Sequence, residues 1–188
     1  MKQTGKRLFA VLLTIALCLS LFPVMASAEN DAVAITSLSE ITDLSGSYKL
    51  SGDITVNEPL SGTFNGTFDG GGHTVTISIS KDGDSVGMFA YIGAGAVVKN
   101  FTVDTAAVAN AGYYDPKTGA IAGCCYGTIS NVRVLSADVT SSGTIGGLVG
   151  YLDSTGTVTQ CSIDAGAVKS KSTADKPVAA SSVKTMAL

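Results

Sequence analysis

Two aspartates and an arginine are the strongest catalytic candidates in this sequence. Asp104 and Asp164 occupy equivalent positions in two related segments, and Arg133 lies between them in the chain. Enzymes that cleave acidic polysaccharides combine such aspartates with arginine or lysine. However, the intervening segment carries Leu135 at the same place, and two strand spacings would separate the carboxylates by about 9–10 Å. That distance lies at the far edge of the range for inverting glycosidases, so we predict no catalytic residues.

A glycine-rich stretch, Gly70-Gly71-Gly72, is a candidate for phosphate binding. A phosphate loop follows a strand and opens a helix, so that backbone N–H groups face the anion. Here the glycines precede HTVTISIS, whose alternation predicts a strand instead. We therefore expect a tight turn in which glycine supplies positive φ and the Asp69 carboxylate caps the backbone. His73, the only histidine, is expected to hydrogen-bond to the backbone at this corner, since no catalytic partner accompanies it.

Metal and redox chemistry have little support in the sequence. Asp82 and Asp84 form an isolated acidic pair, which is more typical of a solvated turn than of a calcium site. We therefore predict neither a metal site nor a cofactor. Beyond residue 28 the cysteines are Cys124, Cys125 and Cys161. Adjacent cysteines rarely pair, so we expect buried free thiols, while a bridge from Cys161 to either of the other two remains open.

Tyrosines are the remaining binding candidates, because the chain contains no tryptophan. Aromatic rings that face solvent offer an apolar surface together with a polar hydroxyl group. The tyrosines in the central part of the chain are Tyr91, Tyr113, Tyr114, Tyr126 and Tyr151. We select Tyr91, Tyr126 and Tyr151 as a candidate ligand platform, which requires that the fold bring them to one face.

Three repeated segments must position these residues. They are VGMFAYIGAGAVVKNFTVD (86–104), GAIAGCCYGTISNVRVL (119–135) and GGLVGYLDSTGTVTQCSID (146–164). Their alignment gives three apolar columns and one polar column: Val98/Ile129/Val158, Phe101/Val132/Cys161, Val103/Val134/Ile163 and Asn100/Asn131/Gln160. The apolar columns are predicted to face a core, which turns Arg133, between Val132 and Val134, outward.

Such repeats predict an all-β fold, a parallel β-helix built from stacked coils. A single coil cannot bury its apolar face, whereas stacking places like residues above like and builds one continuous core. The composition agrees, because Gly, Ser, Thr, Val and Ala dominate the chain. A β-sandwich is the alternative, but columns in register favour the solenoid. In a solenoid the amide side chains of the polar column can hydrogen-bond from coil to coil.

The motifs GGLVGY and GTISNVRV resemble the repeats of the GLUG-motif family of bacterial surface and adhesin-like proteins. The upstream segment from YKLSGDITV to FNGTFDGGGHTVTI is similar to the stretch that opens such arrays, which usually carries a histidine at the place of His73. This resemblance covers about residues 38–167 and implies a right-handed parallel β-helix on the cell surface. It implies no particular ligand. The second repeat departs from the pattern, since Cys124 stands where the others have Tyr91 and Tyr151.

The N-terminal residues predict export. Three basic residues precede an apolar stretch from Leu8 to Phe22, and Ala26-Ser27-Ala28 supplies small residues for cleavage before Glu29. Residues 1–28 are therefore predicted to be a secretory signal peptide, because the apolar stretch is short for a membrane anchor. Its removal takes three of the 12 basic side chains and none of the 15 acidic ones, leaving a net charge of −6. This balance argues against nucleic acid as a partner, and no second segment approaches the length of a membrane span.

We divide the remaining chain into three parts. Residues 29–47 contain Ser37 and Glu40 in a capping-box pattern, which predicts a short amphipathic helix over the first coil. Residues 48–167 form the predicted β-helix repeat domain, and residues 168–188 read as a flexible tail or linker. An uncapped last coil exposes strand edges, so we expect weak self-association through the C-terminal end.

These observations favour a secreted or cell-surface module with a structural or adhesive role and no catalytic activity. Its expected partners are glycans or proteins of a host or cell surface. A carbohydrate-binding module is the alternative, and a polysaccharide-degrading enzyme is the weaker one. Tyrosines gathered on one face would favour the carbohydrate-binding module. A cleft with convergent acids and Arg133 would favour the enzyme.

Overall fold

A computed structural model describes residues 32–112 and 114–170. The chain divides into two units, Met1–Asp31 and Ala32–Leu188. The predicted signal peptide, the first residues of the predicted cap, Tyr113 and residues 171–188 lie outside the described residues.

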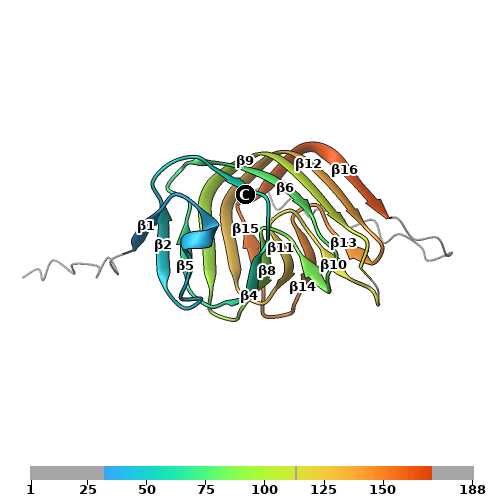
Figure 1. Ribbon diagram of the computed structural model, residues 1–188, viewed down its shortest axis with the longest axis horizontal. Helices are drawn as coiled ribbons and strands as arrows, with labels where there is room; N and C mark the ends of the chain where they lie inside the picture. The colour runs from blue at the N-terminus through green and yellow to red at the C-terminus, as the bar shows by residue number, and fades with distance from the viewer. Residues whose placement is uncertain (1–31, 113, 171–188) are drawn as a thin grey trace, which may run out of the picture. The chain divides into compact units, whose positions relative to one another are not determined.

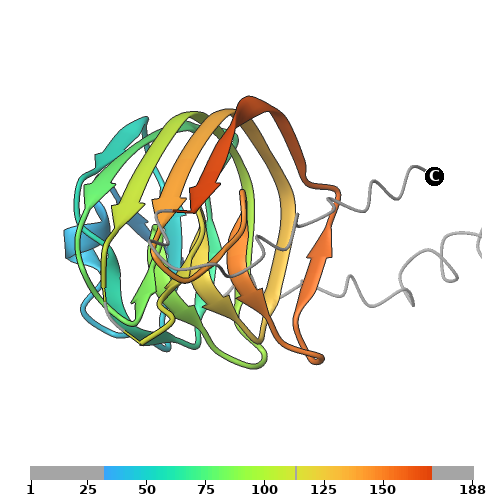
Figure 2. The same cartoon turned by 90° about the vertical axis from the view of Figure 1, so that its right-hand side faces the viewer.

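The described part is an all-β parallel solenoid of about four turns (Figure 1). One sheet has the order β1-β2-β5-β9-β12-β15, to which β3, β6 and β16 add; the others are β4-β8-β11-β14 and β7-β10-β13. The strands are β1 (Val33–Ile35), β2 (Ser47–Leu50), β3 (Ile54–Val56), β4 (Leu60–Phe64), β5 (Thr67–Asp69), β6 (Thr74–Ser80), β7 (Ser85–Val86), β8 (Phe89–Ile92), β9 (Val97–Asn110), β10 (Lys117–Thr118), β11 (Ala122–Cys125), β12 (Thr128–Ser141), β13 (Thr144–Ile145), β14 (Val149–Leu152), β15 (Thr157–Thr159) and β16 (Ser162–Ser170). Figure 2 shows the stacked coils with the last coil toward the viewer.

Strand register confirms the predicted columns. Ile129 pairs with Val98 on one side and Val158 on the other, and Val134 pairs with Val103 and Ile163 in the same way. All of these pairs are parallel, which rules out the antiparallel sandwich. The parallel β-helix is therefore confirmed, while its right-handed sense stays a prediction.

The apolar columns form the core, as predicted. Val98, Ile129, Val103 and Val134 are fully buried, and Val132 is 1% exposed. The corresponding residues of the last coil are only partly buried, because no further coil covers them among the described residues; they are Val158, Cys161 and Ile163. Aromatic rings also pack in this core. The ring of Phe101 contacts that of Phe68, from the preceding coil, edge-on at a centroid distance of 5.8 Å.

The prediction of an N-terminal capping helix is wrong. The segment forms a single 3-10 turn, η1 (Leu38–Glu40), and the chain is extended again at Ile41. Ser37 does act as an N-cap, accepting a hydrogen bond from the Ser39 N–H. The Glu40 carboxylate, however, accepts bonds from the Thr36 N–H and hydroxyl outside the turn. The hydrogen bonds of Ser37 and Glu40 therefore stabilise a single turn and do not start a helix. Leu38, within this turn, is buried with Ile41 in the core.

A sharp corner follows the first part of each of the last three coils. Its backbone adopts positive φ at Asn100 (62°), Asn131 (52°) and Gln160 (53°). The preceding coil uses glycine there, with Gly71 at 61° and Gly72 at 81°. Positive φ is uncommon for side chains other than glycine and asparagine. The glycine-rich turn is thus confirmed as a conformational device, and the polar column serves the same corner in later coils.

Hydrogen bonds tie this corner together from coil to coil. The Asp69 carboxylate accepts the Gly71 N–H at 2.9 Å, which confirms the predicted turn cap. The Asn100 Nδ2 group donates to both Asp69 oxygens at 3.2 Å, and Asn131 Nδ2 donates to Asn100 Oδ1 at 3.0 Å. Of the expected amide ladder, the step from Asn131 to Asn100 is confirmed, and the stack continues from Asn100 to the Asp69 carboxylate. Within the described part of the chain, Gln160 does not extend it.

A second polar ladder, which the sequence did not predict, lies inside the solenoid. Asn110 is 1% exposed, and Thr118 and Ser141 are fully buried. Asn110 Nδ2 donates to the Gly83 carbonyl at 2.9 Å and to Thr118 Oγ1 at 3.1 Å. Asn110 Oδ1 accepts the N–H groups of Gly83 and Gly112. Thr118 Oγ1 then donates to Ser141 Oγ at 2.9 Å, so the ladder holds the turns around β7, β10 and β13 to the core.

Strand pairing extends past residues 48 and 167 at both ends of the predicted repeat domain. β1 pairs with β2 from Val33 onward, and β16 pairs with β12 as far as Ser170. In the last coil Leu152 and Val168 remain 47% and 44% exposed. These side chains continue buried columns of the coils before them. Weak self-association through this end stays a prediction.

Candidate functional site

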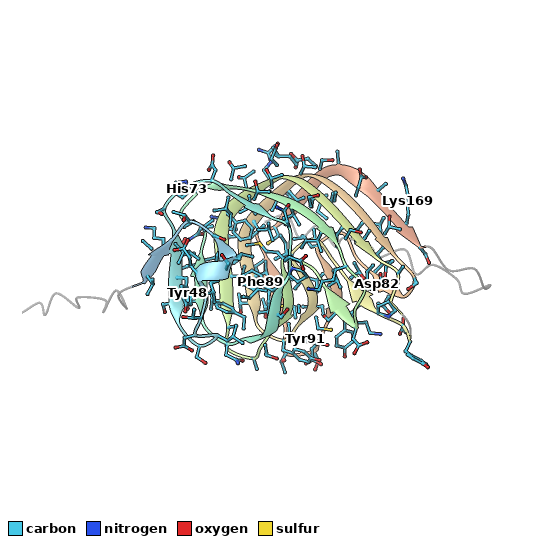
Figure 3. The ribbon with its side chains drawn as sticks, in the orientation of Figure 1. Tyr48, His73, Asp82, Phe89, Tyr91 and Lys169 are labelled. Carbon is cyan, nitrogen blue, oxygen red and sulfur yellow. The ribbon has the colours of Figure 1, made fainter. Side chains whose placement is uncertain are left out.

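The predicted tyrosine platform lies on the β4-β8-β11-β14 sheet. Tyr91 of β8 and Tyr151 of β14 both stand in register with Cys124 of β11. The next residues along β8 and β11, Ile92 and Cys125, are fully buried. Because side chains alternate across a strand, Tyr91 and Cys124 point to the outer face. Figure 3 shows Tyr91 on the outside of the solenoid.

Tyr126 completes the group, which we call the tyrosine cluster: Tyr91, Tyr126 and Tyr151. Tyr126 follows the inward-facing Cys125 and lies next to Tyr151, with ring centroids 6.4 Å apart and planes inclined by 59°. Cys124 points outward but is only 6% exposed, since tyrosines surround it. Tyr91 and Tyr126 are half-buried and Tyr151 is 41% exposed. The three selected tyrosines therefore share one face, as the platform hypothesis requires.

Asp153 lies beside the cluster and was missed from the sequence. It follows β14, where its Oδ1 atom accepts the Thr155 N–H at 3.0 Å and the Thr155 hydroxyl at 2.9 Å. The same hydroxyl lies 3.2 Å from the carbonyl of Tyr126, the residue that follows β11, so this turn packs against the previous coil. The Tyr151 hydroxyl approaches Asp153 Oδ2 at 3.5 Å. The signal in the sequence was the turn pattern Asp153-Ser154-Thr155-Gly156, typical of an aspartate that bonds the backbone two residues on.

The acid–base properties of the cluster follow from this crowding. Burial raises the pKa of Tyr126, and the neighbouring groups of Cys124, Tyr151, Asp153 and Tyr91 raise it further. The hydrogen bonds from Thr155 lower the pKa of Asp153. At neutral pH the cluster therefore combines a protonated Tyr126 hydroxyl with an ionised carboxylate.

A second surface feature follows the corner of the coils. It is a shallow groove of about 260 Å³, lined by Gly72, Asn100, Phe101, Thr102, Asn131, Val132, Arg133 and Gln160. Asn100 and Asn131 already bond along the ladder. The polar groups in the groove are therefore the side-chain amides of this corner and the guanidinium of Arg133. The corner residues that supply the amides have a structural role in turning the chain.

The catalytic candidates do not form a constellation. Arg133 faces outward, as predicted, but its Nε atom donates to Asp164 Oδ2 at 2.9 Å and its Nη2 atom to the same oxygen at 2.5 Å. The ion pair occupies the guanidinium that an acidic substrate would need. The Asp104 side chain, which is exposed, makes no hydrogen bond or ion pair with the described residues.

His73 and the acidic turn have structural partners. The His73 N–H donates to the Gly70 carbonyl at 2.9 Å, as expected at this corner. Its imidazole, however, lies 3.6 Å from Asp53 Oδ1, which also accepts the Thr74 N–H, so the side chain faces a carboxylate of the previous coil and not the backbone. Asp82 Oδ1 accepts the Ala111 N–H at 2.8 Å. Asp82 thus ties two loops together.

The three described cysteines are free thiols. Cys125 lies in the core column with Ile92 and Leu152, and burial raises the pKa of its thiol to about 11. Burial also raises the pKa of Cys161. Thiols with raised pKa are poor nucleophiles and metal ligands, so these cysteines act as small apolar side chains.

Two further tyrosines were binding candidates. Tyr113 lies outside the described residues, and Tyr114 is fully exposed in a positive-φ turn.

Over residues 32–112 and 114–170, no group of three or more histidine, cysteine and acidic side chains is close enough to hold a metal ion. Helices long and apolar enough to cross a membrane are absent from the same residues.

Comparison with known proteins gives one partial similarity. Halomucin from Haloquadratum walsbyi (strain DSM 16790 / HBSQ001) is 38% identical over 101 residues, which is 53% of this chain. The matched region spans about 1% of the length of halomucin. No protein-family model matches the chain, and no solved structure matches it.

Proposed function

We propose that this protein is a secreted or cell-surface β-solenoid module with a structural or adhesive role and no catalytic activity. The observation that carries the proposal is the stack of parallel coils with its polar side chains bonded along the stack, from Asp69 through Asn100 to Asn131. Such a stack is a stiff scaffold that presents a regular outer surface. Membership in the GLUG-motif repeat family and a right-handed coil are parts of the same proposal.

Two further observations support an extracellular setting. The N-terminal residues have the pattern of a cleavable signal peptide. The similarity to halomucin covers about half of the chain and about 1% of that protein. A repeated module of a surface protein would match a long relative over a short stretch in this way.

The absence of catalysis is tested directly with polysaccharides. We expect the purified protein to release neither unsaturated nor reducing ends from neutral or acidic polysaccharides, with or without calcium. The reason is that Arg133 is paired with Asp164 and does not converge with a second acid on a cleft. Release of ends that disappears in Asp104→Ala or Asp164→Ala would show that the protein is an enzyme.

Carbohydrate binding is the second candidate function. The tyrosine cluster favours it, because three tyrosines and a carboxylate share one outer face. Adhesion and carbohydrate binding are compatible, since an adhesive module needs a contact surface.

A further inference from the structure

We infer that the tyrosine cluster and Asp153 together form a binding site for an uncharged sugar unit, with Asp153 excluding acidic sugars. This inference rests on the proposed function of a surface module that contacts glycans. It adds Asp153, which stands at the repeat position of Tyr126 in the next coil, and it names the chemical class of the ligand.

The first step is the aromatic surface. The rings of Tyr126 and Tyr151 have centroids 6.4 Å apart and are inclined to each other. They therefore do not stack face to face, and together they form one angled aromatic surface. Tyr151 is 41% exposed and provides the outermost ring. The small side chain of Cys124 stands between Tyr91 and Tyr151 in the register. The C–H faces of a sugar pack on such rings, whose faces carry partial negative charge.

The second step is the free oxygen of Asp153. Thr155 donates two hydrogen bonds to Oδ1 and none to Oδ2. The contact from the Tyr151 hydroxyl to Oδ2, at 3.5 Å, is long. The carboxylate is thus held in place through one oxygen while the other remains able to accept hydrogen bonds from sugar hydroxyl groups. Hydrogen bonds to an ionised acceptor are stronger than those between neutral groups.

The third step is the sign of the charge. Asp153 forms no ion pair with the lysine and arginine side chains of residues 32–112 and 114–170. The hydrogen bonds from Thr155 keep the pKa of Asp153 low, so the site is anionic at neutral pH. An acidic sugar would place a second negative charge beside an unpaired carboxylate. Neutral sugars avoid this repulsion and still use the free oxygen.

The experiment is isothermal titration calorimetry of the purified protein with a small panel of ligands. The probes are cellohexaose, xylohexaose and mannohexaose as neutral oligosaccharides, hexagalacturonate as the acidic one, and choline as a cation. We expect at least one neutral oligosaccharide to bind and hexagalacturonate not to bind. Tyr151→Ala should weaken the neutral ligand about tenfold, whereas Tyr114→Ala, which removes a fully exposed tyrosine outside the cluster, should leave its affinity unchanged.

Asp153→Asn provides the test that does not depend on tyrosine packing. Asparagine can keep the bonds to Thr155, so the turn is retained while the charge is lost. We expect the neutral ligand to bind about tenfold more weakly and hexagalacturonate to gain affinity relative to the unsubstituted protein. Thermal unfolding of each variant verifies that it is folded.

Several results would overturn the inference. They are binding of choline alone, tighter binding of hexagalacturonate than of any neutral oligosaccharide, no binding by the panel, or an Asp153→Asn variant with unchanged affinities. Export and lack of catalysis are measured separately, so failure here leaves the proposed surface role standing. Conversely, retention inside the cell would contradict that role even if a sugar bound.

Discussion

Replacing Val132 by aspartate is expected to destabilise the solenoid by about 4 kcal/mol or more. Val132 is 1% exposed and pairs with Phe101 in the neighbouring coil. The new carboxylate would lie in an apolar column with no cation beside it. Because each coil is stabilised by its neighbours, the loss would spread to the stack. Chemical and thermal unfolding, followed by circular dichroism, measure the change.

Thr105→Asp is the matched control for this substitution. Thr105 lies on β9, in the strand next to that of Val132, and its side chain is exposed. The same added charge should change the free energy of unfolding there by no more than about 0.5 kcal/mol. Equal stabilities of the two variants would show that the assigned inward and outward faces are incorrect.

Asn110→Ala is expected to destabilise the protein by about 3 kcal/mol. The substitution removes the partners of three backbone groups, the N–H and carbonyl of Gly83 and the N–H of Gly112. These groups lie around a side chain that is 1% exposed, so water does not readily replace the amide. The midpoint of urea-induced unfolding measures the effect.

Asn65→Ala controls for the loss of an asparagine at the surface. Asn65 is exposed, and its side chain makes one hydrogen bond, to the Thr63 carbonyl at 3.1 Å. Its replacement should cost no more than about 0.5 kcal/mol. If Asn110→Ala were as mild as Asn65→Ala, the interior polar ladder would contribute nothing measurable to the fold.

The core of the fold could be predicted because its signal is repeated. A column such as Val98, Ile129 and Val158 reports the same environment three times, so errors at one position do not shift the register. The corner residues behaved similarly, since Asn100 and Asn131 share both a position and a positive φ. The inside ladder of Asn110, Thr118 and Ser141 was missed because Asn110 and Ser141, which pair in register, share no residue type, and Thr118 comes from a different strand, β10.

The N-terminal end was harder to predict because local and tertiary signals disagree there. Ser37 and Glu40 satisfy a helix-start pattern, yet the Glu40 carboxylate bonds to Thr36 instead. Burial of Leu38 and Ile41 against the first coils is compatible with an irregular chain, so no helix is needed to cover that end. A capping box indicates where a helical turn can begin, but it does not determine how far the helix continues.

The candidate site was predicted in part. Tyr91 and Tyr151 could be identified from equivalent repeat positions, and Tyr126 follows two residues after Cys124, on the same face. Asp153 was not selected, although it occupies the same repeat position as Tyr126, because its role depends on which carboxylate oxygen Thr155 leaves free. His73 likewise has a partner, Asp53, that only the stacking of coils brings near.

Export is the central claim, and the N-terminus of the exported protein tests it most directly. The full chain is expressed in a bacterial host, and protein is recovered separately from the cells and from the surrounding medium or cell surface. Cleavage after Ala28 predicts that the protein outside the cytoplasm begins with Glu29. An uncut chain that begins with Met1 and stays in the cytoplasm would contradict the proposed role as a secreted surface module.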